Sequence, residues 1–415
     1  MEQRGKIGVV GTGFIARGFV MAIEDQRDLE IVKVLTRRDT DRCPEFPRQD
    51  LLTNSVTELV DHAEVVVECS GDVIHATDVV DEALKAGLPV VTMDSEFHVT
   101  TGSYFLDRGV VTEAEGDQPG CLAALCDDVI QMGFKPLVYG NIKGFLNENP
   151  TLAEMEFWSK KHGISLQQVT AFTDGTKVQI EQALVANGLG AGIAVPGLLG
   201  ITSDDIESGA RTLADGAKRL GYPISDYVLS PGSPAGVFIA AEHQDHQQDY
   251  LRYLKLGDGP YYILLKPFHL CHLEIAKTVR RVLRGGGAFL NNTQHPKISV
   301  GTIAKRRLEP GTQIERGLGS FDVRGETVRI AEEEGHVPIG LFANAVVTRT
   351  VEPGQLITFD DVELPDTLAL RAWRDIERRV IEFERENGLD EGLRSLVVNE
   401  GEMEVVEAPS QKAKV

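Results

Sequence analysis

The segment GVVGTGFIA, residues 8–16, decides the fold, because it joins a short apolar run to a helical pattern through a glycine-rich turn. It contains the pattern G-x-G-x-x-A. The first glycine permits a tight turn, the second lets the backbone approach a pyrophosphate, and the small last residue allows close packing of a helix on a sheet. The helix N-terminus then offers free N–H groups to the phosphates. The residues predicted to bind a dinucleotide here are Gly11, Thr12, Gly13, Phe14 and Ile15.

Outward from this turn, apolar runs and helical patterns alternate. Residues 30–35, 64–69 and 89–93 have the composition of buried strands, and residues 15–23 and 74–86 have helical periodicity. Strands that alternate with helices at this spacing predict a parallel, doubly wound α/β sheet with right-handed connections. Cys69, Ser70 and Gly71 follow one of these strands. Because such folds bind their cofactor at the carboxyl ends of the strands, we expect this loop to contact it.

The end of the second predicted strand bears on the choice of cofactor. Sites that prefer NAD(H) place an Asp or Glu there to bind the ribose 2′-hydroxyl, whereas a 2′-phosphate requires Arg. Here the strand runs into Arg37 and Arg38, and the first carboxylate is Asp39. The alternative is a solvated basic turn. The sequence predicts NADP(H) as the cofactor, in preference to NAD(H).

The pattern of predicted secondary structure changes twice beyond this first part of the chain. After Gly133 the loops lengthen, and between residues 299 and 364 short β-like runs are separated by turns such as Glu-Pro-Gly. Residues 366–386 form a charged amphipathic pattern, and the last twenty or so residues are expected to be loosely ordered. The predicted organisation is a Rossmann domain at 1–132, an α+β catalytic domain at 133–297, a small β-rich module at 298–365, and a helix with a tail at 366–415.

Composition narrows the classes of function. The formal net charge of −21 argues against non-specific nucleic-acid binding, which needs clustered Lys and Arg. No stretch approaches the roughly 18 uninterrupted apolar residues of a membrane span, and no apolar leader precedes the first strand. The five cysteines are scattered without a C-x-x-C pattern, which favours reduced thiols. We therefore expect a cytoplasmic protein that acts on a small molecule, without nucleic-acid or membrane partners.

Candidate catalytic residues lie around a turn in the second predicted domain. Asp174 and Lys177 flank Gly175 and can face one pocket, where a lysine beside a carbonyl or hydroxyl oxygen moves a proton or stabilises an alkoxide. The alternative is a surface turn in which Asp174 caps a helix. Glu96 follows a predicted strand, in the position where doubly wound folds place active-site residues.

A third group of polar residues lies nearer the end of the second domain. Lys266 and His269 could hold an anionic part of the substrate. Two histidine groupings, at residues 243–246 and 269–272, raise the question of a metal. Neither has the ligand spacing of the familiar zinc patterns, so no metal site is predicted.

Taken together, these motifs resemble the homoserine-dehydrogenase-like oxidoreductases that carry a C-terminal SAF domain. The group includes an enzyme whose activity resembles that of 1-deoxy-D-xylulose 5-phosphate reductoisomerase, which forms 2-C-methyl-D-erythritol 4-phosphate with NADPH. The resemblance implies a Rossmann domain, a catalytic domain that supplies the interface of a homodimer or higher homo-oligomer, and an SAF-type module. The stretches that carry it are residues 11–16, 94–96, 115–120, 174–177, 266–270, 308–311 and 338–341.

Two departures count against homoserine dehydrogenase itself. True members keep a lysine shortly after the strand that here runs into Asp94. They also carry an Asp-rich segment that leads to a second lysine. This chain departs from the family at both places. We therefore predict an NADP(H)-dependent oxidoreductase for a small polar hydroxy or keto compound, with reductoisomerase-like activity as the most specific hypothesis. Lys177 would transfer the proton, and Asp174 would orient the side chain of Lys177. Glu96 would bind substrate hydroxyls or act as a second base. The alternatives are homoserine dehydrogenase, another sugar or polyol dehydrogenase, and a non-catalytic NADP(H)-binding sensor.

Overall fold

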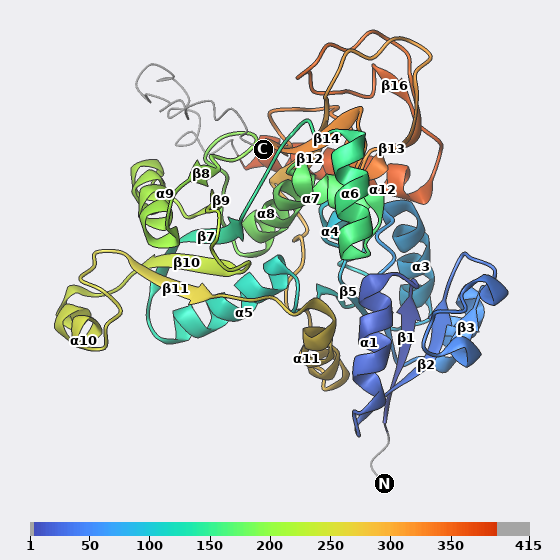
Figure 1. Cartoon of the computed structure of the whole chain (residues 1–415), viewed down its shortest axis with the longest axis horizontal. Coiled ribbons are helices and arrows are strands. Elements are labelled where there is room, and N and C mark those ends of the chain that lie inside the picture. The colour runs from blue at the N-terminus through green and yellow to red at the C-terminus, as the bar shows by residue number, and fades with distance from the viewer. Residues whose placement is uncertain (1–3, 388–415) are drawn as a thin grey trace.

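The computed structural model describes residues 4–387 and begins with a six-stranded parallel sheet in the order β3-β2-β1-β4-β5-β6 (Figure 1). The predicted tail beyond residue 387 lies outside the described residues. The sheet order and the parallel pairing confirm the doubly wound Rossmann architecture. Its strands are β1 (Gly5–Val10), β2 (Leu29–Leu35), β3 (Leu52–Thr53), β4 (Val65–Glu68), β5 (Val90–Thr92) and β6 (Val111–Glu113).

Helices cover both faces of this sheet, which is why its central strands are apolar runs without alternation. Val9 and Val67 on one face, and Val10 and Val66 on the other, are fully buried. The helices between β1 and β6 are α1 (Phe14–Glu24), α2 (Val56–His62), α3 (Val73–Lys85) and α4 (Ser95–Thr100).

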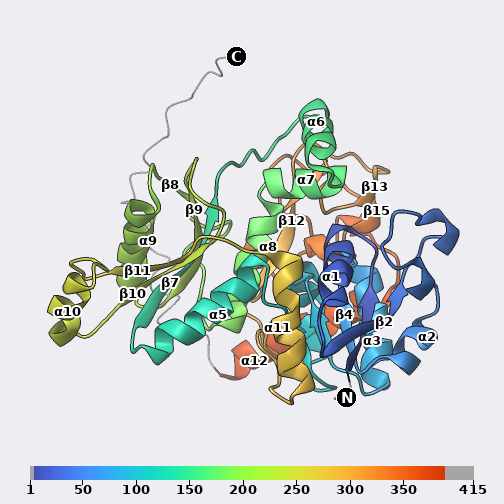
Figure 2. The ribbon, with the colours of Figure 1, turned by 60° about the horizontal axis from the view of Figure 1, so that its bottom comes forward.

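A second, five-stranded mixed sheet has the order β11-β10-β7-β9-β8. Its two faces pack against α5 and α9, and α8 lies between this sheet and the C-terminal strands (Figure 2). Its strands are β7 (Lys135–Lys143), β8 (Ile201–Thr202), β9 (Ile224–Leu229), β10 (Val237–Glu242) and β11 (Tyr262–Lys266). Its helices are α5 (Gln118–Gln131), α6 (Leu152–His162), α7 (Leu166–Thr173), α8 (Thr176–Gly188), α9 (Ile206–Leu220) and α10 (Gln248–Tyr253).

One more helix, α11 (Cys271–Leu283), returns to the first sheet, where Ile275 and Val279 pack in the same core as Phe19 of α1. Conversely α5 packs on the second sheet. The predicted boundaries after residues 132 and 297 assign α5 to the Rossmann domain and α11 to the catalytic domain, whereas each helix packs on the sheet of the other domain. An amphipathic helix shows that it has a buried face, but not which of two sheets that face covers.

The C-terminal β module consists of two small antiparallel sheets, in agreement with the predicted β-rich module. The two similar Glu-Pro-Gly segments lie side by side, because the backbone groups of Leu308 and Val351 exchange hydrogen bonds of 2.9 and 3.0 Å. Helix α12 (Leu368–Glu386) buries Trp373 in the core of this module. The strands are β12 (Ile298–Ala304), β13 (Gln313–Arg316), β14 (Val323–Arg329), β15 (Ala343–Val347) and β16 (Val362–Glu363).

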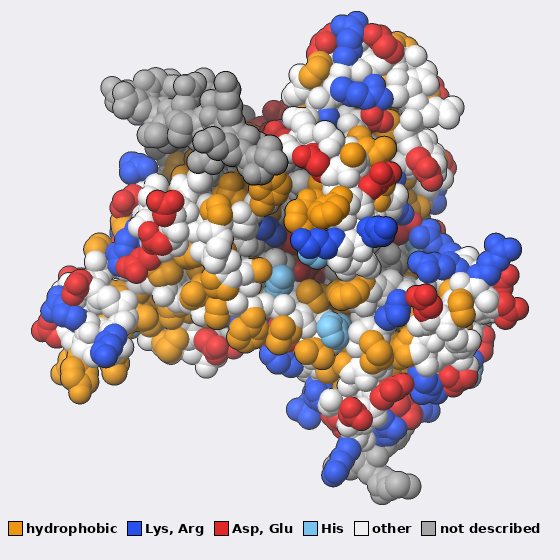
Figure 3. Space-filling view, viewed as in Figure 1, with side chains coloured by type: hydrophobic (Ala, Val, Ile, Leu, Met, Phe, Trp, Pro, Cys, Tyr) orange, Lys and Arg blue, Asp and Glu red, His pale blue; other side chains and the backbone are white. Residues whose placement is uncertain are grey.

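The surface mixes acidic and basic side chains, with hydrophobic groups at the far end of the second sheet over α10 (Figure 3). Tyr253 and Leu254 are 84% and 70% exposed there. Among the described helices, none combines the length and the apolar character that crossing a membrane requires.

Candidate active site

The loops predicted to bind the cofactor lie together at one edge of the parallel sheet. Val10 pairs with Leu35 on one side and with Glu68 on the other, so the loops after β1, β2 and β4 leave the sheet at the same level. Gly11 has φ +104°, and a Cβ there would lie 2.8 Å from the carbonyl oxygen of Cys69. Glycine is therefore required at this crossing of two loops.

The start of α1 has the geometry of a phosphate cradle. Gly13 is the N-cap of α1, and no side chain caps its N–H groups. Apart from Gly13 itself and its two chain neighbours, no heavy atom of the described residues lies within 4 Å of the position of a Cβ on Gly13. Open space in front of free helical N–H groups fits the pyrophosphate of a dinucleotide. Phe14 and Ile15, the other predicted residues here, form the first turn of the helix.

Arg37 and Arg38 lie on the turn after β2, where the sequence placed the adenosine end of the cofactor. Asn54 anchors this turn by donating hydrogen bonds of 2.6 and 2.8 Å to the carbonyl oxygens of Thr36 and Arg38. Both residues line a hollow of about 440 Å³ that His75 also lines. The side chain of Arg37 is 58% exposed, and one of its nitrogens lies 2.9 Å from a carboxylate oxygen of Asp72.

A second polar centre forms where three helix N-termini meet. Lys177 lies in the first turn of α8, Glu96 in the first turn of α4 after β5, and Asp117 is the N-cap of α5. The Lys177 Nζ atom lies 3.5 Å from Glu96 Oε2 and 3.4 Å from Asp117 Oδ2. Only 12% of the Lys177 side chain is exposed. We call these three residues the Lys177 cluster.

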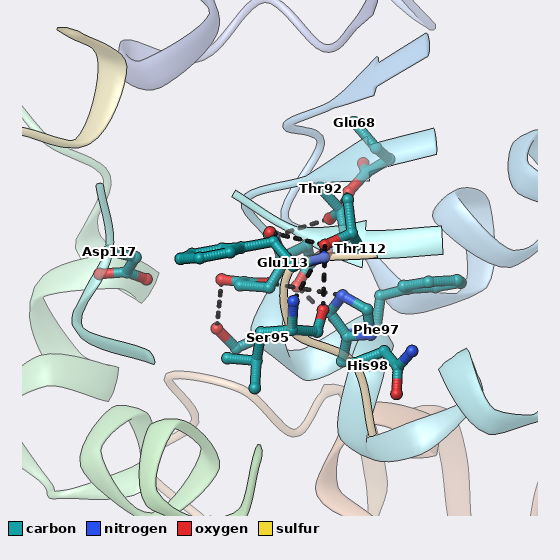
Figure 4. Close-up of polar contacts among 12 residues, drawn as sticks. Glu68, Thr92, Ser95, Phe97, His98, Thr112, Glu113 and Asp117 are labelled. Carbon is teal, nitrogen blue, oxygen red and sulfur yellow. Dashed lines mark hydrogen bonds and ion pairs between the residues drawn. The ribbon is translucent and has the colours of Figure 1, made fainter. Parts of the chain in front are cut away.

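Further carboxyl groups surround the Lys177 cluster at the carboxyl ends of β4, β5 and β6. Ser95 Oγ donates to Glu113 at 3.0 Å, and Thr92 Oγ1 donates to Glu68 at 3.0 Å (Figure 4). One turn along α8, Glu181 accepts hydrogen bonds from side chains of β7, and its carboxylate is buried. Acidic side chains therefore outnumber Lys177 at this edge of the sheet.

The crowding of carboxyl groups determines which of them are charged. Burial disfavours the charged amine, but Glu96, Asp117 and Glu181 outweigh it and raise the pKa of Lys177 well above its usual value. Burial and the neighbouring charge of Glu96 raise the pKa of Asp94 well above its usual range. Burial likewise opposes the charge of Glu96, yet Lys177 and a hydrogen bond from Asp94 lower its pKa. The contacts therefore favour the charged forms of Lys177 and Glu96 and the neutral form of Asp94.

His98 follows in the same helix but is not a proton carrier for this site. Its ring is fully buried, and burial lowers its pKa to about 3. Its Nε2 lies 3.6 Å from Glu113 Oε2, and the pKa of Glu113 is raised well above its usual value, chiefly by burial. Burial therefore favours the neutral form of both groups, which leaves Lys177 and Glu96 as the better candidates for proton transfer.

Asp174 lies elsewhere than the sequence predicted. Its carboxylate forms an ion pair of 2.6 Å with Lys305 of the C-terminal β module, and the two side chains are 0% and 3% exposed. Its other oxygen accepts a hydrogen bond of 2.9 Å from the Thr176 N–H at the start of α8. The contacts of Asp174 thus hold the end of the helix that carries Lys177, whereas Lys177 itself faces Glu96 and Asp117.

Lys266 and His269 lie beside the Lys177 cluster rather than within it. Lys266 Nζ contacts Glu274 at 2.7 Å, Glu115 at 3.4 Å and the Cys121 sulfur at 3.2 Å. These carboxylates already neutralise the charge that was expected to hold an anionic substrate. His269 Nε2 lies 3.4 Å from the side-chain nitrogen of Gln118, the residue after Asp117.

Sequence reasoning missed Asp117, Asp94 and Glu113 as members of the site. Two features of the sequence pointed to them. Asp94 follows a predicted strand and Glu113 ends the observed strand β6, and Asp117 lies in a glycine-rich turn. Lys305 carried no local signal, since it reaches Asp174 across 131 residues. Within residues 4–387, no three His, Cys, Asp or Glu side chains form a group that could hold a metal ion.

Two family models match the chain. Residues 11–102 match the NAD-binding domain of homoserine dehydrogenase, and residues 116–275 match the catalytic domain of the oxidoreductase DRL. Each match covers less than half of the chain, and the two together liken it to the NAD(P)-binding oxidoreductases of the DRL and homoserine dehydrogenase-like group. Comparison with curated proteins finds no similar sequence.

Solved structures that resemble the chain include three enzymes at low identity. A homoserine dehydrogenase from Thiobacillus denitrificans is 12% identical, with 84% of this chain and 97% of that chain covered and a TM-score of 0.41. UDP-N-acetylglucosamine 3-dehydrogenase from Acidithiobacillus ferrooxidans is 13% identical, with coverages of 69% and 91% and a TM-score of 0.40. Dihydrodipicolinate reductase from Paenisporosarcina sp. TG-14 is 13% identical, with coverages of 69% and 97% and a TM-score of 0.37.

Proposed function

We propose that this chain is an NADP(H)-dependent oxidoreductase of a small polar hydroxy or keto compound, with Lys177 as the group that transfers the proton. The observation that carries the proposal is the protonated Lys177, held between Glu96 and Asp117 at the sheet edge where the nicotinamide end of a dinucleotide would lie. A cation at this edge is suited to stabilise charge on a substrate oxygen.

The chemistry follows from the charge states. Bound NADPH supplies a hydride to the substrate carbonyl carbon. The carbonyl oxygen gains negative charge as this happens, and Lys177 Nζ donates a hydrogen bond and then a proton to it. Glu96 holds the ammonium in place, because the two groups attract each other in a largely water-free site. In the oxidative direction the same proton returns to Lys177.

Glu96 and Asp117 also favour a substrate with several hydroxyl groups. Each carboxylate has a second oxygen, and ionised carboxylates act only as hydrogen-bond acceptors. Hydroxyls beside the reacting carbon can donate to these oxygens. A polyhydroxy keto compound of the kind used by reductoisomerase-like enzymes therefore remains our most specific proposal, ahead of aspartate semialdehyde or another sugar or polyol.

The preference for NADP(H) is the second part of the proposal. Arg37 and Arg38 line the hollow at the end of β2, and the carboxylate of Asp39 lies one residue further on. Guanidinium groups form strong, charge-assisted hydrogen bonds with phosphate. A cofactor with a 2′-phosphate would fit this hollow better than one with a free hydroxyl.

The direct test is NADPH consumption, followed by the nicotinamide absorbance, against keto sugars, sugar phosphates and aspartate semialdehyde. We expect turnover with at least one polyhydroxy keto compound. Turnover of aspartate semialdehyde alone would replace the proposed substrate class by homoserine dehydrogenase activity. Tight NADPH binding with no turnover across the panel would contradict the enzyme proposal and favour a cofactor-binding sensor.

A further inference from the structure

A cavity of about 550 Å³ lies between the Rossmann domain and the C-terminal β module. One wall is formed by Arg37, Asp72 and the first turn of α3, and the other by the ends of β13 and β15. The cavity and the hollow at the end of β2 share Arg37 and His75, so they adjoin. Its volume falls within the usual range for ligand pockets.

Asp72 joins the two walls of this cavity. Its Oδ2 atom lies 2.9 Å from a nitrogen of Arg37 and 3.0 Å from a nitrogen of Arg316. Its Oδ1 atom accepts a hydrogen bond from the His75 N–H at the start of α3. Burial alone would raise the pKa of Asp72, but the His75 N–H, Arg37 and Arg316 together lower it. We call Arg37, Asp72 and Arg316 the Asp72 cluster.

The charges of the Asp72 cluster do not balance. Two guanidinium groups share one carboxylate, which leaves one positive charge beside the N-terminus of α3. Arg316 is 34% exposed and Arg37 58% exposed, so both retain donors that face solvent. Asp78, Glu96 and Glu315 also line the cavity, so the positive surplus is confined to the two guanidinium groups around Asp72, whose remaining donors favour an anion with several acceptor oxygens.

The wall that carries Arg316 is packed closely on the Rossmann domain. A Cβ on Gly340 would lie 2.4 Å from the Thr100 hydroxyl and 3.0 Å from a methyl group of Val73. Arg316 also donates a hydrogen bond of 3.2 Å to Gln167 of α7. The wall that carries Arg316 is therefore fixed against the Rossmann domain, and the Arg316 side chain itself is tied to α7 by a hydrogen bond.

We propose that the C-terminal β module completes the cofactor site, with Arg316 as a second guanidinium, beside Arg37, for the 2′-phosphate of NADP(H). The inference rests on the proposed function, because it concerns the same cofactor. It adds a specificity-determining residue from a part of the chain 244 positions after Asp72. Asp72 occupies one donor nitrogen of each arginine, and a 2′-phosphate competes with it for these two nitrogens.

The test is binding of NADPH and NADH to Arg316→Gln, followed by the change in nicotinamide fluorescence. We expect the Kd for NADPH to rise about tenfold or more, because one charge-assisted phosphate contact is lost, while the Kd for NADH changes little. 2′,5′-ADP and 5′-AMP, used as competitors, isolate the effect of the 2′-phosphate. The matched control is Arg349→Gln, which removes an exposed arginine of the same module.

A second variant, Asp72→Asn, tests the competition. Asparagine keeps the helix cap but removes the negative charge, so the Kd for NADPH should fall severalfold. Equal losses of NADPH and NADH affinity in Arg316→Gln would overturn the inference, and so would the absence of any loss. Neither outcome would contradict the proposed preference for NADP(H), which also rests on Arg37. Weaker NADH binding by Asp72→Asn with unchanged NADPH binding would also overturn it, since Asp72 would then serve a ribose hydroxyl.

Discussion

The Lys177 cluster and the Asp72 cluster lie at the same edge of the parallel sheet with opposite balances of charge. In the first, one largely buried amine lies between two carboxylates, with more acidic groups behind them. In the second, one carboxylate lies between two partly exposed guanidiniums. An acidic surplus around a buried lysine holds a proton at one atom, whereas two guanidinium groups that share one carboxylate keep donors for an anion.

This difference separates two tasks that a dehydrogenase must perform. Proton transfer needs a group whose water has been displaced and whose position is fixed by its neighbours. Cofactor binding needs a contact that forms and breaks in each turnover. Removing one group from each cluster should therefore alter different measured quantities.

The largest expected effect is on turnover by Lys177→Met. Loss of the proton donor should lower kcat by ~10²–10⁴-fold, as for other general acids, while the Kd for NADPH stays within about threefold. Steady-state kinetics and fluorescence titration give the two numbers. Lys218→Met removes a half-exposed lysine of α9 and serves as the control. Retained turnover would remove Lys177 from the mechanism.

Lys305→Met should have the next largest effect, on stability. It leaves Asp174 charged and buried without its partner, and breaking a buried ion pair from one side costs about 3–5 kcal/mol. Urea unfolding measures the loss. A variant with unchanged stability but lower kcat would instead place Asp174 and Lys305 in the chemistry.

Replacing Arg37 and Arg38 by Ala should act on the other cluster. The KM for NADPH should rise about 10- to 100-fold, because two phosphate-facing guanidiniums are lost, and the KM for NADH should change less than about threefold. Steady-state kinetics with both cofactors checks this. Equal changes would show that the turn after β2 does not read the 2′-phosphate.

Replacing Glu274 should have the smallest effect, on the free energy of unfolding. The carboxylate of Glu274 lies among charges that balance. Burial opposes its charge, but hydrogen bonds from Lys266, the Leu270 N–H and Lys277 lower its pKa to about 2. Because the folded-state pKa lies below the usual 4.5, its contribution is present above pH 4.5 and is lost as the pH falls towards 2. Once solvent screening is allowed for, Glu274→Gln should cost about 2 kcal/mol at pH 7, and urea unfolding should show this difference shrinking below pH 4.5. A constant difference would contradict the assigned pKa.

Much of the cofactor region could be predicted because the residues that indicate it lie close together in the sequence. Gly11 and Gly13 stand two residues apart, and Arg37 follows its strand directly. Lys177 could be singled out by residue type, but its partners could not. Glu96 is 81 positions away, and Asp117 comes from the N-terminus of a third helix, so only the packing of α4, α5 and α8 brings them together. The pairing of Asp174 with Lys305 was missed for the same reason.

The sequence by itself determined the doubly wound sheet, the glycine-rich turn and the presence of basic side chains after the second strand, because each depends on residues close together in the chain. Only the tertiary structure decided which carboxylates surround Lys177, which sheet α5 and α11 cover, and which module faces Arg37. Those outcomes depend on the packing of distant elements, and a buried charge takes its partner from whatever the fold places beside it.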